Sequence, residues 1–352
     1  MPRIDPVAVQ RLAESNGFRP DVVEQILHLK NLLQLIADDP VLSSRLVLIG
    51  GTAINLFTPT VPRLSVDIDM DYAKPVREVF DQKSVKQHLN LLGRLGNALG
   101  MKYFKLSRDG EDGHGRLRVI FEYKSDFGRE AGTVKIDISY LMKCMVFQPK
   151  RRKMSTLGSE DPFTDLRVLA SDPCELWAGK ALALVYKAKN DPQPEDVADL
   201  YSMEIARHLF DVARLETCLR NKSRFLDQQK LRKAFVLKGV PRVKQLFFLS
   251  GEGIRHCSAH EVKQQLDPYL RQSDESPSGA VRPPLDEMKT LGKEFLFRVC
   301  SNRWSLGEKK FVELFQKKGE FRPDLLFGKG SREYSRISAN QYLHEAARGM
   351  AR

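Results

Sequence analysis

The chain has 352 residues, more than one typical domain, so we expect two domains. A hydrophobic content of 42% is ample for a core and excludes a disordered chain, and no run of about 18 apolar residues occurs that would span a membrane. The formal net charge of +12 favours polyanionic partners, nucleic acid first among them.

The first half of the chain alternates between helical and strand patterns. Leucine and isoleucine spacing predicts helices before Asp39-Pro40, and apolar alternation predicts the strands. In chain order we expect helices over 5–40, a buried strand in RLVLIGG (45–51), a helical turn in TAINLF (52–57), a strand in PRLSVDIDMDY (62–72), a helix over 76–100, two strands within 101–125 joined by a glycine-rich turn at 110–115, and a strand in GTVKIDISYL (132–141).

The second half reads as mainly helical. Asp172, Pro173 and Glu175 form a helix start, with an acid at the N-cap and proline at the first position. Further helices are expected over 196–220, 285–315 and 338–350, and the Ser- and Pro-rich segment 273–284 reads as an exposed linker. We therefore expect an α+β fold with an N-terminal domain over 1–160 and a mainly helical, basic domain over 161–352.

The charge is unevenly distributed. Residues 1–150 hold 21 basic and 18 acidic residues, which leaves 36 basic and 27 acidic residues for the second half. Residues 221–250 carry eight basic residues against one acid, Asp227. This stretch predicts a surface for nucleic acid, although a solvated helical face is an equally simple reading.

The strand around residue 67 has an apolar face and a charged face. Leu64, Val66, Ile68 and Met70 alternate with polar residues, which are Arg63, Ser65, Asp67, Asp69 and Asp71. Like charges side by side repel, so a cation should offset them. Asp67 and Asp69 would lie roughly 7 Å apart on one face and could hold Mg²⁺, with Mn²⁺ as an alternative. A solvent-facing antiparallel strand is the alternative interpretation.

Two further features suit the same site. Gly50-Gly51-Thr52 ends a buried strand, where glycines let backbone N–H groups approach a phosphate, although most such pairs are simply turns. Asp137 stands on the polar face of another apolar strand and could be a metal ligand or base beside an attacking hydroxyl. Taken alone, it could equally be an exposed acid beside Lys135.

The order of GGTA, RLSVDID and KIDI after a helical N-terminus resembles the AbiEii/AbiGii nucleotidyltransferase toxins, which include the MenT toxins, of the polymerase-β-like superfamily. The resemblance is closest over about residues 40–75 and continues more loosely to about 205. It implies an N-terminal mixed sheet flanked by helices and then a helical domain. It also implies an NTP substrate, a tRNA 3′ end as acceptor, and a toxin with a cognate antitoxin in a toxin–antitoxin or phage-defence system.

The resemblance also implies roles for residues. Gly50 and Gly51, with Thr52 close by, would cradle the triphosphate, Asp67 and Asp69 would bind metal, and Asp137 would be the third acid. Additional nucleotide-site candidates are Arg63, Ser65, Lys180 in ELWAGKALAL, and Asp196 and Asp199 in EDVADLY. The chain has Ile49 where many relatives have lysine, and Glu195 where they have a basic residue, which affects nucleotide selectivity more than catalysis.

The function expected from these observations is Mg²⁺-dependent transfer of an NMP to an RNA hydroxyl. A nucleotidyltransferase acting on a small molecule or protein, and a non-catalytic RNA-binding protein of the same fold, are the alternatives. Five scattered cysteines without a CxxC pair, and an N-terminus without an apolar signal region, predict a cytoplasmic protein with no membrane partner.

Weaker candidates lie elsewhere in the chain. The HCSAH stretch could suggest zinc, but it lacks a second ligand pair, so polar surface residues are the simpler reading. QPKRRK (148–153) could touch RNA phosphates, with a solvated loop as the default. Four phenylalanines near the basic stretch could stack on bases, although core packing is commoner; they are Phe225, Phe235, Phe247 and Phe248.

Overall fold

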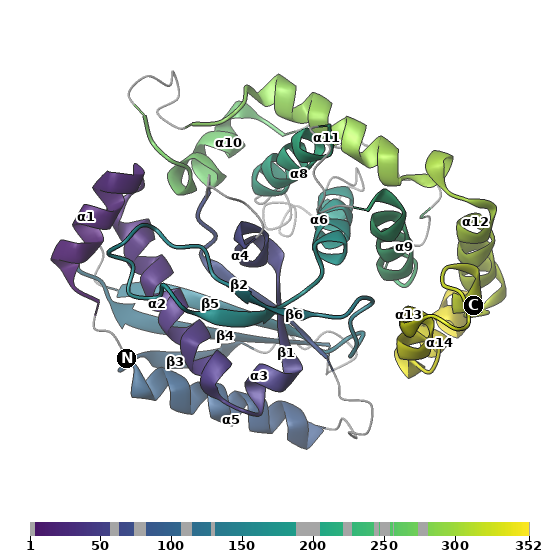
Figure 1. Ribbon diagram of the computed structural model, residues 1–352, viewed down its shortest axis with the longest axis horizontal. Coiled ribbons are helices and arrows are strands. Elements are labelled where there is room, and N and C mark those ends of the chain that lie inside the picture. The colour runs from purple at the N-terminus through teal and green to yellow at the C-terminus, as the bar shows by residue number, and fades with distance from the viewer. Residues whose placement is uncertain are drawn as a thin grey trace. The chain divides into compact units, whose positions relative to one another are not determined.

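The chain forms two compact units (Figure 1). Unit 1 contains Met1–Ser171 and Tyr269–Val281, and unit 2 contains Asp172–Pro268 and Arg282–Arg352. The computed structural model describes residues 4–56, 63–73, 82–106, 115–127, 131–187, 205–220, 227–242, 246, 254–255, 257–273 and 281–351. The expected boundary between residues 160 and 161 falls inside unit 1. Most of the expected linker, residues 274–280, lies outside the described part of the chain.

Unit 1 is the mixed sheet flanked by helices that the sequence predicts. Its strands are β1 (Leu46–Ile49), β2 (Asp67–Tyr72), β3 (Lys102–Leu106), β4 (Arg116–Lys124), β5 (Ala131–Ser139), β6 (Lys150–Lys153) and β7 (Arg167–Ala170), and its helices are α1 (Pro6–Asn16), α2 (Pro20–Asp38), α3 (Leu42–Arg45), α4 (Gly50–Asn55) and α5 (Gln82–Ala98). The strand order is β3-β4-β5-β2-β1-β7-β6. β2 runs parallel to β5, and β1 parallel to β7, while the other neighbours are antiparallel.

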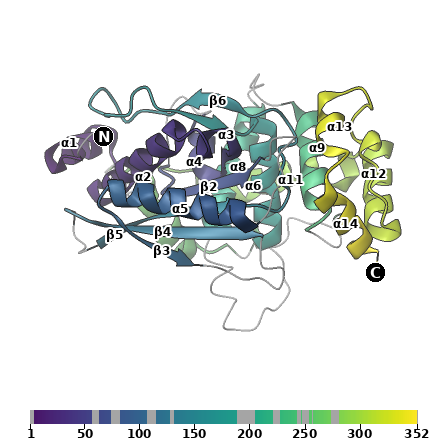
Figure 2. The same cartoon turned by 90° about the horizontal axis from the view of Figure 1, so that it is seen from below.

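Alternation along β2 decides which face of the sheet becomes the core. Ile68, Met70 and Tyr72 are buried, and the Tyr72 ring lies 5.5 Å from that of His88 on α5. Helices α2 and α5 both lie along the sheet (Figure 2). The acidic residues of β2 alternate with these core residues, so they point to the opposite face.

Strand β2 begins later than the sequence pattern predicts. The expected strand covers residues 62–72, but sheet pairing starts at Asp67. The segment before it pairs with the returning chain instead: Arg63 bridges Leu270, and the Leu64 amide donates to the Tyr269 carbonyl at 2.9 Å. A pairing between segments some 200 residues apart leaves no mark in local alternation.

The basic run QPKRRK is not wholly a loop, because residues 150–153 form the edge strand β6. It pairs antiparallel with β7, from Lys150 opposite Ala170 to Lys153 opposite Arg167. Consecutive charged residues on an edge strand discourage pairing with another chain. The default expectation of a solvated loop is therefore wrong for residues 150–153, and the weaker reading, contact with RNA phosphates, stays untested.

Unit 2 is helical, as predicted. Its elements are α6 (Pro173–Lys187), α8 (Ile205–Arg220), α9 (Gln228–Gly239), α10 (Ala259–Gln265), η3 (Asp267–Tyr269, whose last residue belongs to unit 1), α11 (Leu285–Val299), η4 (Ser301–Arg303), α12 (Leu306–Glu313), η5 (Leu314–Lys318), η6 (Pro323–Leu325), α13 (Arg332–Ile337) and α14 (Gln341–Met350). Asp172 caps α6 by accepting a hydrogen bond from the Cys174 amide at 2.9 Å, which confirms the predicted helix start.

A buried ion pair ties the segment after β6 to α2. The Lys30 ammonium contacts the Asp161 carboxylate and donates to the Ser155 carbonyl at 2.9 Å. Asp161 also accepts from the amides of Leu157 and Phe163. Burial lowers the pKa of Lys30 more than the facing carboxylate raises it. The pair therefore depends on these surrounding hydrogen bonds for its stability.

We expect Lys30→Met to lower the free energy of unfolding by about 3–5 kcal/mol, because it leaves a buried carboxylate without its cation. Urea unfolding at pH 7 measures the change. Lys153→Met is the matched control, since Lys153 pairs with Asp165 at 3.4 Å on the surface and its loss should cost less than about 1 kcal/mol. Equal losses in the two variants would contradict this role for Lys30.

Candidate active site

The glycine turn, which is Gly50-Gly51-Thr52 where β1 passes into the start of α4, is packed directly against one of the predicted metal ligands. Gly50 has φ of +71°, a left-handed conformation that favours glycine, and Ile49 pairs in register with Asp69. A Cβ at Gly50 would lie 2.1 Å from Asp69 Oδ2, closer than any real contact. Only glycine therefore lets the turn and this carboxylate occupy their positions.

A buried polar cluster fixes the rest of the turn to the segment that leads into β2. A Cβ at Gly51 would meet Ser65 Oγ at 2.6 Å and Arg63 Nη2 at 2.7 Å. The Thr52 hydroxyl donates to the Asp67 carbonyl at 2.7 Å. Thr52, Arg63 and Ser65 are each less than a tenth exposed. In this structure these three side chains hold the turn, and any contact with nucleotide remains a prediction.

Three carboxylates lie at neighbouring register positions on one face of the sheet. Asp67 and Asp69 alternate along β2 and are half-buried. Asp137 on β5 is the parallel-register partner of Asp69, so the two Cα atoms are neighbours across about 4.8 Å. The structure thus brings the three predicted acids together beside the glycine turn. Asp71 continues the row at the end of β2, next to Ser139.

Two cations offset the repulsion of these acids. The Lys135 ammonium lies 3.2 Å from Asp67 Oδ1, and Lys135 is the register partner of Asp67 on β5. The Arg118 guanidinium on β4 donates to both oxygens of Asp137, at 2.6 and 2.5 Å. Sequence reasoning missed Arg118. The alternation in RLRVIFEYK does place it on a polar face, but not beside Asp137.

The acids suit a hard divalent cation that also binds phosphate oxygens. In the described part of the chain no three His, Cys, Asp or Glu side chains gather closely enough to hold a metal by themselves. Mg²⁺ is commonly held by one or two carboxylates together with substrate phosphates. Asp67 and Asp69, next to a turn that a Cβ would fill, fit that arrangement. Asp137 is engaged by Arg118 and would have to exchange that partner to join them.

The candidates from the helical half are placed differently. Lys180 belongs to α6 in unit 2, where its ammonium is 3.0 Å from Asp211 Oδ2 and both side chains are buried. A contact with phosphates would require this pair to open. Asp196 and Asp199 lie outside the described residues, so their predicted role stays a prediction.

Several cations of the basic stretch 221–250 are committed to pairs within unit 2. Lys230 lies 3.0 Å from Asp172, and Lys238 is buried 2.9 Å from Glu175. Phe235 is fully buried, which confirms the core reading for that aromatic residue. The remaining three phenylalanines, Phe225, Phe247 and Phe248, are outside the described ranges. The structure therefore supports a packing role for this part of the stretch.

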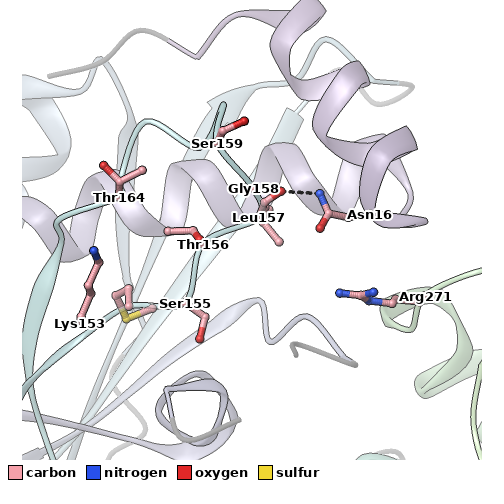
Figure 3. A pocket seen from close by; sticks show the side chains of 10 residues that line it. Asn16, Lys153, Ser155, Thr156, Leu157, Gly158, Ser159, Thr164 and Arg271 are labelled. Atoms are coloured by element: carbon pink, nitrogen blue, oxygen red, sulfur yellow. Dashed lines mark hydrogen bonds between the residues drawn. The ribbon is translucent and has the colours of Figure 1, made fainter. Parts of the chain in front are cut away.

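A separate hollow in unit 1 lies between the end of α1 and the segment after β6 (Figure 3). Its volume is about 610 Å³, and it is lined by Asn16, Lys153, Met154, Ser155, Thr156, Leu157, Gly158, Ser159, Thr164 and Arg271. The Asn16 amide donates to the Leu157 carbonyl at 2.5 Å. The hollow contains none of the sheet carboxylates and is distinct from the candidate site.

Comparison with known proteins identifies the family to which a chain with these acids and glycines belongs. The sequence model of the AbiEii nucleotidyl transferase toxins of type IV toxin–antitoxin systems matches residues 32–283. The chain belongs to this family. It is accordingly a nucleotidyltransferase toxin, whose substrate is an NTP and whose partner is an antitoxin. Enzymes of this family usually require a divalent metal ion.

One solved structure supports the fold, and a second is reported for comparison. MenT4, a nucleotidyltransferase toxin from Mycobacterium tuberculosis, is similar over 99% of this chain and 100% of its own, with a TM-score of 0.58 and 15% identity. JHP933 from Helicobacter pylori matches 80% of this chain and 94% of its own, at 17% identity and a TM-score of 0.40. Curated proteins show no significant match. Among the described helices, none is long and apolar enough to cross a bilayer.

We expect Gly50→Ala to lower NTP turnover at least tenfold, because the new methyl group displaces the Asp69 carboxylate. Pyrophosphate release measures turnover. Gly100→Ala is the matched control: Gly100 has φ of +69° with nothing within 4 Å of its Cβ position, so it carries the same backbone strain, about 1–2 kcal/mol, without the collision. Full turnover in Gly50→Ala, or equal losses in both variants, would contradict the argument.

Proposed function

We propose that this AbiEii-family enzyme transfers an NMP from an NTP to the 3′ hydroxyl of a tRNA and thereby blocks translation. A bond forms between the acceptor oxygen and the α-phosphorus. The bond between the α-phosphorus and the oxygen that bridges it to the β-phosphorus breaks, and pyrophosphate leaves with that oxygen. Mg²⁺ is the proposed metal, with Mn²⁺ as a substitute. The reaction takes place in the cytoplasm, which is consistent with the four described cysteines forming no disulfide.

One observation carries the proposal: the glycine turn, the two β2 acids and the β5 acid follow one another across a single sheet face. Gly50 contacts Asp69, and Asp69 pairs with Asp137. Phosphoryl transfer places the attacking and leaving oxygens roughly in line on opposite sides of phosphorus. A triphosphate over the turn leaves its pyrophosphate there, and the acceptor hydroxyl approaches from the β5 side.

Each acid then has a task that its position allows. When bound, the metal ion neutralises charge on the triphosphate, and Asp67 and Asp69 would hold it. Asp137, on the acceptor side, accepts the proton of the attacking hydroxyl. Arg118 orients that carboxylate through its two hydrogen bonds. Lys180 stabilises phosphate charge in this proposal if its pair with Asp211 opens.

The choice of RNA as acceptor rests on charge. The chain carries +12 at pH 7, which attracts a polyanion along with the NTP. A neutral small-molecule acceptor would gain nothing from that charge, and a small anion would gain less than a polyanion. The antitoxin of such a system protects the cell from this transfer.

Asp69→Asn should reduce labelling of RNA at least a hundredfold, because an amide binds a divalent cation far more weakly than a carboxylate. The assay incubates the chain with each α-labelled NTP, Mg²⁺ and total tRNA. Asp71→Asn is the control on the same strand and face, and it should stay within about threefold of wild type. Wild-type enzyme that leaves all RNA unlabelled would overturn RNA as the acceptor.

A further inference from the structure

The sheet face that carries the acids continues past Asp137 to the edge of the sheet. Lys135 pairs with Asp67 on one side and with Ile120 of β4 on the other, and Ile120 pairs with Phe104 of β3. Register partners point to the same face of a sheet. Phe104 therefore stands on the acid face, three strand spacings or about 14 Å from Asp67.

The Phe104 side chain does not pack into the core. Half of its surface is accessible to solvent. Its neighbour Tyr103 points to the other face, where the ring lies 6.4 Å from that of Phe121 and over Gly93 of α5. The core face of β3 is thus served by Tyr103, and Phe104 presents an aromatic ring beside charged groups.

The part of this face that surrounds Phe104 is basic if the three acids of the candidate site, Asp67, Asp69 and Asp137, are not counted. Five cations from β3, β4 and β5 share this face, and they are Lys102, Arg116, Arg118, Lys124 and Lys135. The one acid among them on β4 is Glu122, which pairs with Lys102. Lys102 and Arg116 are exposed. Lys102 lies two residues from Phe104 along β3, and Arg116 lies four positions along β4 from Ile120, the partner of Phe104. An exposed aromatic ring that shares an open strand surface with exposed cations is typical of single-stranded nucleic-acid binding.

We propose that this face of β3, β4 and β5 binds the single-stranded end of the acceptor RNA, with a base stacked on Phe104 and phosphates held by Arg116 and Lys102. This inference rests on the proposed function, because it assumes an RNA acceptor. It adds the place where that acceptor is bound. In-line geometry requires the acceptor to arrive from the β5 side of the acids, and this surface begins there.

The spacing suits a short stretch of RNA. Phe104 is on β3, two strands away from Asp137 on β5, and it lies two residues along β3 from the position level with Asp137. The Cα atoms of Phe104 and Asp137 are therefore about 12 Å apart. A nucleotide near the reacting one reaches the ring while the terminal hydroxyl lies at Asp137. Specificity would then come from stacking on the last bases rather than from the body of the RNA.

Phe104→Ala should raise the KM for total tRNA about five- to a hundredfold, the range for losing one base–aromatic stack, and leave the KM for NTP unchanged. Phe104→Trp should restore the KM for tRNA to within about threefold of wild type, because the ring can still stack. Phe297→Ala in unit 2 is the matched control, since Phe297 is 53% exposed and outside this surface. Initial rates with α-labelled NTP give both constants.

The outcomes separate the two proposals. Wild-type enzyme that labels tRNA while Phe104→Ala keeps the wild-type KM overturns the RNA surface and leaves the proposed function standing. A wild-type enzyme that labels no tRNA overturns both. A rise in KM for NTP equal to that for tRNA also overturns the surface, because it points to disruption of the sheet instead of a lost stack.

Discussion

The parallel pairing of β2 with β5 is the constraint on which the site depends. It places Asp69 beside Asp137 and Asp67 beside Lys135, so one register pair joins two carboxylates and the next joins a carboxylate to an ammonium. Three carboxylates this close would repel strongly if left alone. Lys135 and Arg118 offset that repulsion in the structure. The acidic strand can therefore fold before any metal ion or nucleotide is present.

The same two cations make one side of the site basic and so distinguish it from the side with the glycine turn. Lys135 and Arg118 both come from the β4–β5 side of the acids, while the glycine turn lies on the β1 side. A triphosphate and its metal ion suit the side with the turn, where Gly50 contacts Asp69. The basic side suits the acceptor. If Asp67 holds a metal ion, as proposed, the Lys135 ammonium would lose its present partner and would be available to a phosphate.

The sequence predicts much of this site, because alternation in RLSVDIDMDY already separates a core face from an acid face. The glycine pair and the helix start at Asp172 are equally local signals, and the structure agrees with them. Arg118 and Phe104 were beyond reach, since their neighbours depend on strand register. So was the burial of Lys180 against Asp211, which a helical pattern alone does not indicate.

The central claim is that Asp67 and Asp69 form a metal site that the substrate completes. The most direct measurement is Mn²⁺ binding by electron paramagnetic resonance, with and without NTP. Mn²⁺ should bind weakly to the chain alone and at least tenfold more tightly with NTP, and Asp69→Asn should abolish that tightening. Unchanged Mn²⁺ binding in Asp69→Asn, with NTP present and the variant folded, would contradict the claim.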